Sequence, residues 1–500
     1  MRRLLFALLC CLSLAAHAAI DPAAVRQLAA EESDDKIAAI RKLALTAEPD
    51  ALALLQQLAD GTLKDGKGEE ITLNNRVRRE LEGALAVLKL IDPDVAVRYK
   101  AVKEIATNVD AAMAPMLVKA RDRESDPKIR ALLVEIHALA TLKNANPQIR
   151  LAAARALASS ADPNTQAALK AQSEPANEAE VEVRRAAFQS WLAVKDRLTL
   201  AENIGRVFSG LSLGSILLLA ALGLAITYGV MGVINMAHGE LLMIGAYATY
   251  VMQGLFRTHF PEQLDWYLLA AVPVAFFAAA AVGVLLERTV IRWLYGRALE
   301  TLLATWGLSL MLIQAARVIF GAQNVEVANP VWMSGGLEIL PSIVLPLNRI
   351  VIVGFALFVL MLVWVLMNQT RLGMFVRAVT QNRAMAGCVG VPTGRIDTVA
   401  FALGAGIAGL GGVALSQIAN VGPDMGQGYI VDSFMVVVLG GVGQLAGAVW
   451  AALGLGIVTK FIESWAGAVI AKIVVLVFII MFIQKRPQGL FALKGRFVES

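Results

Sequence analysis

A histidine and a glutamate lie two residues apart in the stretch INMAHGELLMIGAYATYV, residues 234–251, which is otherwise apolar enough for a membrane helix. Ionisable side chains are costly to bury in a bilayer, and those found there usually face the interior of a helix bundle or a water-filled path. On a continuous helix, Asn235 and His238 share one face, whereas Glu240 lies about 200° round from His238. The chemistry open to these groups is hydrogen bonding to a polar solute in transit.

The alternative is that both ionisable groups lie near the cytoplasmic end of their helix, half solvated or bonded to a neighbouring helix, and only fix the fold. Asp432 is a second candidate for a polar path, because it opens the hydrophobic region 431–484. An interfacial helix cap explains this aspartate equally well. Tyr228 and Gln417 are weaker candidates of the same kind.

The composition divides the chain into two parts that need different solvents. The whole chain has 500 residues, of which 57% are hydrophobic and 17% charged. Residues 19–203 hold 26 Lys and Arg and 28 Asp and Glu, whereas residues 204–500 hold 17 and 12. The first part is therefore typical of a water-soluble domain, and the second of a membrane domain, with the boundary near Gly205.

The first 18 residues, MRRLLFALLCCLSLAAHA, have the features of a signal peptide. Arg2 and Arg3 precede an apolar run too short to span a bilayer, and the last three residues, AHA, fit the small-x-small pattern of a cleavage site. Residues 19–203 should therefore be exported. Cleavage after Ala18 leaves Cys388 as the only cysteine, so the exported domain must be stable through packing alone.

The exported domain contains a repeated pattern of helix starts. An Asp-Pro or Asn-Pro pair precedes several apolar segments of helical spacing, and such pairs favour a capped first turn. The recurring arginines lie 20, 32, 20 and 34 residues apart, at Arg78, Arg98, Arg130, Arg150 and Arg184. Stacked helical hairpins of this kind resemble HEAT-like repeats. A plain helical bundle is the alternative, and in either case no residues suited to chemistry are evident.

The second part, residues 204–490, contains successive apolar segments of about twenty residues, the length that crosses a bilayer. The expected spans are 208–230, 233–255, 267–287, 299–320, 349–367 and 397–417, with two or three more in 431–484. The fold class is therefore all-α: a polytopic membrane protein with about eight or nine spans. Clustered glycines at 440–443 should break one span, either to line a cavity or as a simple kink.

Arginine and lysine in the short loops set the orientation. They gather in loops 288–297 and 368–395, at Lys485 and Arg486, and in the tail, residues 491–500. These segments should therefore be cytoplasmic. Counting the spans backwards then places residue 207 outside, which agrees with the signal peptide. The N-terminal domain should therefore lie outside the cytoplasm.

The cytoplasmic loop 370–396 carries a short amphipathic pattern. Its apolar residues include Phe375, and its charges include Arg371, Arg377 and Arg383. Such a helix either lies on the membrane surface or docks in the groove of a partner protein, and the pattern alone favours neither.

Residues 205–495 resemble the branched-chain amino acid type of ABC-importer permease across almost their whole length. The matching stretches are GLSLGSILLLAALGLAITYGVMGVINMAHGELLMIGAY, TRLGMFVRAVTQNRAMAGCVGV followed by FALGAGIAGLGGV, and VVVLGGVGQLAGAVWAALGLGI. Within that family, the stretches GPDMGQGYIVDSFMVVVLGGVGQLAG and IQKRPQGLFALKGR look closest to the urea-importer type with a long exported extension.

The resemblance implies a permease that forms half of a translocation path for urea. It implies four kinds of neighbour: a second, related permease, two cytoplasmic ATPases, a periplasmic binding protein and the lipid bilayer. It also implies a place in the inner membrane of a bacterium, with the N-terminal domain in the periplasm. It further implies that the loop at Arg371, Phe375, Arg377 and Arg383 couples to an ATPase, and that this chain needs no cofactor and no ATPase site of its own. Urea would need hydrogen-bonding groups on the path, because unpaired polar atoms in a dry pore are costly.

Four alternatives stay open. The cargo can be a branched-chain amino acid or a short amide, and the chain can act as a passive urea or amide channel. A membrane-anchored scaffold, with the repeat domain as its working part, is the third. An enzyme is the least favoured, because no nucleophile, base and orienting group occur together and no metal-ligand cluster is evident. Nothing in the sequence points to nucleic acid.

Overall fold

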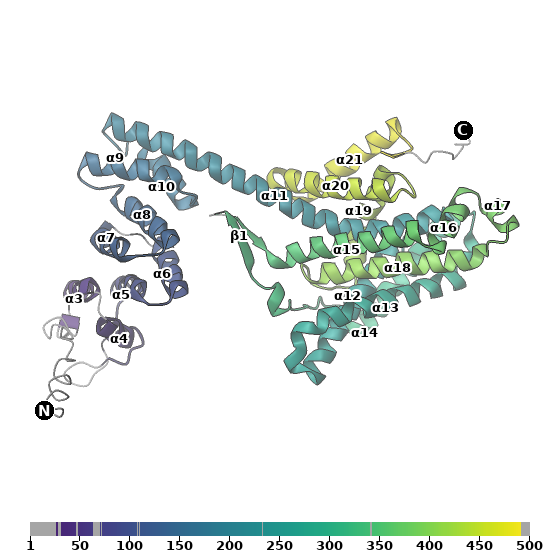
Figure 1. Cartoon of the computed structure of the whole chain (residues 1–500), viewed down its shortest axis with the longest axis horizontal. Helices are drawn as coiled ribbons and strands as arrows, with labels where there is room; N and C mark the ends of the chain where they lie inside the picture. The colour runs from purple at the N-terminus through teal and green to yellow at the C-terminus, as the bar shows by residue number, and fades with distance from the viewer. Residues whose placement is uncertain are drawn as a thin grey trace, which may run out of the picture. The chain divides into compact units, whose positions relative to one another are not determined.

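The computed structural model describes residues 27–28, 32–46, 49–63, 71, 73–107, 109, 111–232, 234–340 and 343–491. The predicted signal peptide, residues 1–18, lies outside these residues, as does the predicted tail beyond residue 491. The chain divides into two compact units, residues 1–199 and 200–500. Helices make up nearly all of both units, which confirms the all-α fold class (Figure 1).

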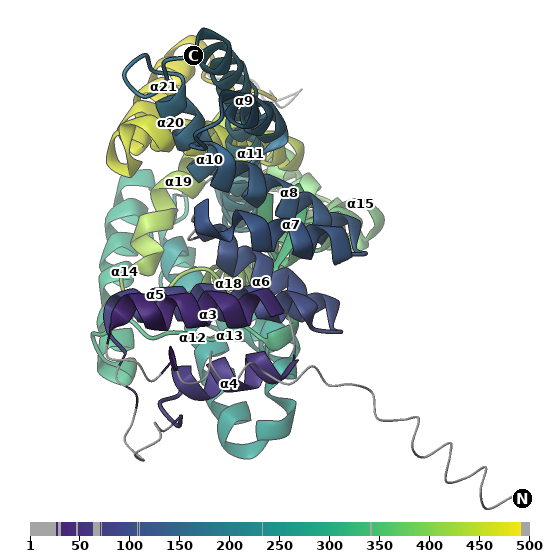
Figure 2. The ribbon, with the colours of Figure 1, turned by 90° about the vertical axis from the view of Figure 1, so that its left-hand side faces the viewer.

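The first unit consists of short helices (Figure 2). In chain order they are α3 (Ser33–Thr46), α4 (Pro49–Ala59), α5 (Asn75–Leu88), η1 (Lys89–Ile91), α6 (Val95–Thr107), η2 (Ala111–Met113), α7 (Ala114–Arg123), α8 (Pro127–Thr141), α9 (Pro147–Ala156), η3 (Leu157–Ser159) and α10 (Pro163–Gln172). The first part of α11 (Val181–Met231) packs with α8 to α10 around a core that includes Leu157 and Leu169.

The predicted helix starts are confirmed at two of the proline pairs. Asp126 caps α8 by accepting hydrogen bonds from the amides of Lys128 and Ile129. Asn146 caps α9 in the same way, through the amide of Gln148. In both helices the proline occupies the first turn, where its missing N–H leaves no bond unmade.

Three of the recurring arginines make the same contact. The Nη1 groups of Arg98, Arg150 and Arg184 each donate to the carbonyls five and six residues earlier, in the turn before their helix. Arg98 and Arg150 also reach a carboxylate in the turn after the next helix: Nε and Nη2 of Arg98 bond Glu124 at 3.0 and 3.1 Å, and those of Arg150 bond Glu178 at 2.7 and 2.8 Å. Three copies of the repeated pattern therefore share one contact. The likeness to HEAT repeats stays a prediction.

Replacing Glu178 by glutamine should lower the thermal midpoint of the first unit by about 5 °C or more, because removing one partner of a buried ion pair leaves the other uncompensated. Glu178 is 4% exposed and joins α9 to the start of α11. Melting of the full chain in detergent and hydrogen exchange in α9 and α10 measure the effect. Glu182→Gln, an exposed change in the first turn of α11, is the control. Equal midpoints for the two variants would contradict the assignment.

The effect of Glu178→Gln should depend on pH. Hydrogen bonding to the Arg150 guanidinium holds the pKa of the Glu178 carboxyl at about 2, below its ordinary value of 4.5. Because the pKa is lowered in the folded state, the stabilisation is complete above pH 4.5 and is lost as the pH falls through about 2. The difference in midpoint between the wild type and the variant should shrink over the same interval.

The second unit is a bundle of long helices. They are the remainder of α11, then α12 (His238–His259), η4 (Pro261–Trp266), α13 (Tyr267–Thr289), η5 (Ile291–Leu294), α14 (Ala298–Phe320), η6 (Val331–Met333), α15 (Leu347–Gln369), α16 (Arg371–Gln381), α17 (Arg383–Cys388), α18 (Thr393–Ser416), α19 (Met425–Gly440), α20 (Leu445–Ala466) and α21 (Ala468–Lys485). An antiparallel hairpin of β1 (Gly336–Leu340) and β2 (Ile343–Pro346) pairs Leu337 with Leu345.

Among the described residues, seven helices are long and apolar enough to cross a membrane. They are α11, α13 with η4, α14, α15, α18, α20 and α21, while α19 is a shorter apolar helix of 16 residues. The polytopic architecture is therefore confirmed. The predicted break at the clustered glycines is confirmed as well, since α19 ends at Gly440 and both Gly441 and Gly443 have positive φ angles.

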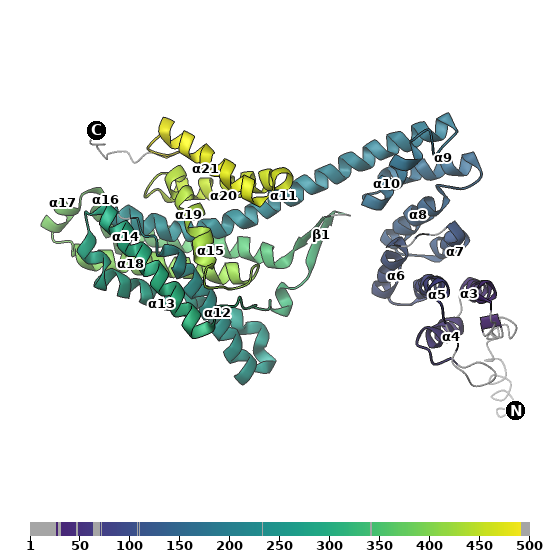
Figure 3. The ribbon, with the colours of Figure 1, turned by 180° about the vertical axis from the view of Figure 1, so that it is seen from behind.

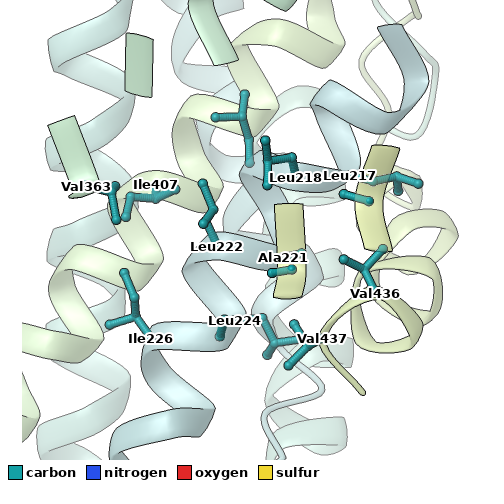
Figure 4. Packing of buried hydrophobic residues seen from close by; sticks show 14 of the residues in the cluster. Leu217, Leu218, Ala221, Leu222, Leu224, Ile226, Val363, Ile407, Val436 and Val437 are labelled. Carbon is teal, nitrogen blue, oxygen red and sulfur yellow. The ribbon is translucent and has the colours of Figure 1, made fainter. Parts of the chain in front are cut away.

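Helices α12, α13 and α18 of this unit pack tightly against one another (Figure 3). Glycines allow the close approach: a side chain at Gly245 of α12 would meet the backbone of Gly409 in α18. A neighbouring core joins α11 to α15, α18 and α19, through side chains such as Leu222, Val363 and Ile407 (Figure 4). Small residues are the usual means of close helix packing in lipid.

Candidate functional site

The structure corrects the prediction of one continuous helix from residue 233. Helix α11 ends at Met231, Gly232 takes the left-handed conformation (φ +65°), and α12 begins only at His238. Asn235 precedes the helix, and its Oδ1 accepts the amide of Ala237 at 3.0 Å, which holds the chain in a turn. Asn235 and His238 therefore do not share a helix face.

The N-terminus of α12 lies deep in the bundle. His238 is fully buried, and its Nε2 lies 3.1 Å from the carbonyl oxygen of Ala220. Ala220 is eleven residues before the end of α11 at Met231, which is about 16 Å along the helix axis. The residues after Met231 thus return about half-way into the bundle without helical structure. Irregular backbone at this depth is tolerated where protein covers it or where it lines a cavity.

Helix α14 holds the irregular segment and the first turn of α12 through two hydroxyls one turn apart. The Oγ1 of Thr305 accepts the amide of Met236 at 3.1 Å, and the Ser309 hydroxyl donates to Oε1 of Glu240. Both hydroxyl residues are buried, at 0% and 3% exposure. The sequence analysis did not select them, although two hydroxyl residues four apart on an apolar helix were a visible signal.

Polar atoms without a partner gather around the start of α12. Asn235 is 3% exposed, and His238 and Glu240 are fully buried. Within the described part of the chain, the Nδ2 of Asn235, the Nδ1 of His238 and the Oε2 of Glu240 make no hydrogen bond. A side chain at Gly426 in α19 would meet that same Oε2, so the glycine there makes room for the carboxylate itself. The three atoms offer a donor, an acceptor and a group able to act as either.

The three other predicted path residues make their contacts elsewhere. The Oε1 of Gln417 accepts the Tyr267 hydroxyl at 3.4 Å. Tyr228 packs against Phe434, with ring centroids 6.3 Å apart. Asp432 lies 3.4 Å from the Lys472 ammonium. Because α19 begins at Met425, Asp432 lies inside the helix, and the alternative that it caps the helix is wrong.

The loop predicted to be cytoplasmic, residues 370–396, forms two helices instead of one. Thr370 caps α16, and Asn382 ends α16 and caps α17. The apolar face of α16 packs into the unit's own core, where Val376 and Val379 are buried and Phe375 is half-buried. This packing removes that face from contact with lipid or with a partner.

Two of the predicted coupling arginines make internal bonds. The Nη1 of Arg377 donates to the carbonyl of Met367 at 2.8 Å, at the end of α15. Arg383 forms an ion pair with the buried Asp397 and lies over the Tyr295 ring, 4.9 Å from its centroid. Arg371 is exposed, and so are Met374, Met385 and Val389 on the same two helices and the turn that follows. Arg377 and Arg383 are exposed as well, so all of these residues belong to the surface of the loop that another protein can reach.

A buried polar network lies next to this loop. Glu287, fully buried at the end of α13, accepts the hydroxyls of Thr398 at 2.8 Å and of Tyr295 at 3.2 Å, and lies 3.7 Å from Arg292. The sequence analysis missed Glu287, although an ionisable residue at the end of an apolar span is itself a signal. In the described residues, no group of three or more His, Cys, Asp or Glu side chains is placed to hold a metal ion.

Comparison with known proteins covers the second unit. A family model described as "Branched-chain amino acid transport system / permease component" matches residues 206–484. The high-affinity branched-chain amino acid transport system permease protein BraD of Pseudomonas aeruginosa is 28% identical over 291 residues, which are 57% of this chain and 94% of that protein. The corresponding protein LivH of Escherichia coli K12 is 29% identical over 298 residues, again 57% and 94% of the two chains.

A shorter likeness extends to the ribose import permease protein RbsC of Escherichia coli K12, which is 30% identical over 100 residues, 19% of this chain and 31% of that protein. No solved structure matches the chain. The family match covers more than half of the 500 residues and nearly all of the helical bundle. The chain therefore belongs to the family of permease components of branched-chain amino acid transport systems.

Proposed function

We propose that this permease carries urea across the inner membrane of a bacterium, past Asn235, His238 and Glu240. The observation that carries the proposal is the set of three buried polar atoms without partners at the start of α12. Urea is small and neutral, with N–H donors and one carbonyl acceptor, so it can bond a carboxylate oxygen, an amide N–H or an imidazole nitrogen as it passes each of them. It needs no fixed counter-ion, and no lysine or arginine bonds these three side chains among the described residues.

The three side chains are covered on all sides in this conformation. Passage therefore requires alternating access, in which the bundle opens first to one side of the membrane and then to the other. We place the driving ATP hydrolysis on two partner ATPases, which push the α16–α17 surface from the cytoplasm. A second, related permease supplies the other half of the path, and a periplasmic binding protein delivers the solute. A cleaved signal peptide would export the N-terminal domain to the periplasm.

Branched-chain amino acids are the second candidate cargo, because the names of BraD and LivH state that transport role. Uptake of radiolabelled urea and leucine, compared in a strain that lacks its own permease and expresses this chain with its partners, separates the two. Urea uptake that leucine does not inhibit supports the proposal, whereas leucine uptake alone rejects it. Urea uptake in ATP-free vesicles containing only this chain would instead favour a passive channel.

Charge reversal at the exposed face of the coupling loop should weaken binding of the ATPase. We expect the double variant Arg371→Glu with Met385→Glu to lower ATPase co-purification at least about tenfold. The variant places two negative charges in a contact surface that has neither of them in the wild type. Arg257→Glu, exposed at the end of α12 on the opposite side of the predicted membrane, is the control.

Arginine replacements inside the loop test a different role. Because Arg383 pairs with the buried Asp397, Arg383→Ala should reduce the amount of folded permease as well as ATPase binding.

Normal co-purification with the Arg371 and Met385 double variant would show that the ATPase binds elsewhere.

A further inference from the structure

The first unit contains a pocket of about 270 Å³ between α3, α5, η1, α6 and α7. Its apolar wall is formed by Ala44, Val87, Leu90 and Met116, none of which is more than 8% exposed. A concave site whose apolar wall is already shielded from water is the usual form of a small-molecule site. The contacts between helices described above do not need this space.

The charged residues around the pocket leave an excess of positive charge. Arg98 and Glu124 both line it, but they neutralise each other through two hydrogen bonds of 3.0 and 3.1 Å. Asp92 also lines it, and its Oδ1 accepts the backbone amide of Asp94 at 2.8 Å.

Two further cations line the same pocket at its exposed side. Neither Lys119 nor Arg123 has an ion-pair partner within the described residues, and both are exposed to solvent. They are four residues apart on α7, so they lie on one face of that helix. Two cations against the single carboxylate of Asp92 leave one positive charge beside an apolar wall.

We propose that this pocket binds a carboxylate attached to a small apolar group about the size of a leucine side chain. The carboxylate lies between Lys119 and Arg123, where it forms charge-assisted hydrogen bonds. The apolar group packs against Val87, Leu90 and Met116 and is itself removed from water. The bidentate Arg98–Glu124 contact fixes α6 to the turn after α7, so the wall is held in place before the ligand arrives. The same chemistry is found in a free carboxylic acid and at the C-terminus of a peptide.

The test uses the full chain in lipid nanodiscs, with 4-methylpentanoate as the probe and calorimetry as the measurement. We expect 4-methylpentanoate to bind, and 4-methylpentanamide and acetate to bind at least about tenfold more weakly, because one lacks the charge and the other the apolar group. This comparison needs no variant. Equal binding of the acid and the amide, or no binding of the acid, would overturn the proposal.

Variants then locate the site. Lys119→Glu with Arg123→Glu should lower the affinity for 4-methylpentanoate at least about tenfold. Lys128→Glu with Arg130→Glu makes the same charge change at exposed positions of α8 outside the pocket and should leave the affinity unchanged. Unaltered binding by the first pair would place the probe elsewhere and reject the assignment.

A last comparison separates the two sources of the carboxylate. The tripeptide Ala-Ala-Leu, with a free or an amidated C-terminus, is added to the chain loaded with 4-methylpentanoate. Displacement by the free-ended peptide alone identifies a chain terminus as the ligand type. Failure of both peptides to displace the probe identifies a small free acid. Displacement by the amidated peptide as effectively as by the free one contradicts a carboxylate site.

Discussion

Uptake of solute by a Glu240→Gln variant should fall at least about tenfold, while the amount of permease in the membrane stays unchanged. The Oε1 of Glu240 accepts the Ser309 hydroxyl, and its Oε2 is a buried acceptor without a partner. Glutamine keeps the shape but replaces one oxygen by an N–H donor, so it cannot offer both acceptors. A hydrogen bond to a charged group contributes about 1.5–3 kcal/mol, which corresponds to tenfold or more in rate.

Two further variants separate a role in transport from a role in folding. Glu262→Gln makes the same chemical change at an exposed position and should leave uptake intact. Ser309→Ala removes the partner but keeps the carboxylate, so it should affect the yield of folded protein more than the uptake per molecule. If Glu240 only fixes the fold through Ser309, both site variants will lose folded protein together. Normal uptake by Glu240→Gln would remove this residue from the path.

The positions of most helices could be predicted from the sequence, because burial in lipid requires long apolar segments whose ends are marked by arginine, glycine and proline. The predicted spans 267–287, 299–320 and 349–367 differ from α13, α14 and α15 by no more than two residues at either end. The helix caps at Asp126 and Asn146 follow from local chemistry alone. These features depend on neighbours in sequence, which the sequence displays directly.

The irregular segment before His238 was missed for a physical reason. Hydropathy averages over many residues, so one polar turn inside an apolar stretch does not interrupt the signal. The local signs were present, since Gly232 permits a positive φ angle and Asn235 favours a turn. The depth of this turn depends on α14, whose Thr305 lies 69 residues further along the chain from Met236, and no local pattern encodes that contact.

The roles of the loop arginines were beyond sequence reasoning in the same way. A charge pattern shows that Arg377 and Arg383 can contact a partner, but not that bonds within the chain already occupy them. Asp397 lies fourteen residues after Arg383, in the next helix, and it becomes a partner only when α17 folds back. The sequence therefore predicted the amphipathic helix of this loop, but it did not reveal that two of the exposed arginines also make bonds within the chain.

Replacing Gly245 by leucine should remove nearly all folded permease from the membrane. A Cβ atom at this position would lie against the carbonyl oxygen and Cα of Gly409, and a backbone cannot rotate away as a flexible side chain can. Overpacking a core costs about 1–3 kcal/mol even where side chains can adjust, and here α12 would have to separate from α18. That separation would also release the segment that holds His238 and Glu240. The amount of monodisperse protein, measured by size-exclusion chromatography of a fluorescent fusion, reports the effect.

Gly254→Leu provides a matched control on the same helix. Nothing lies within 4 Å of a side chain built at Gly254, so leucine there should be tolerated. The two variants share the residue change, the helix and the added hydrophobicity, and they differ in the distance to a neighbouring backbone. A large loss at Gly245 with little loss at Gly254 therefore assigns the effect to the α12–α18 contact. Equal yields would show that α12 and α18 do not approach each other in the membrane as closely as in the structure. The buried position of the start of α12 would then be wrong as well.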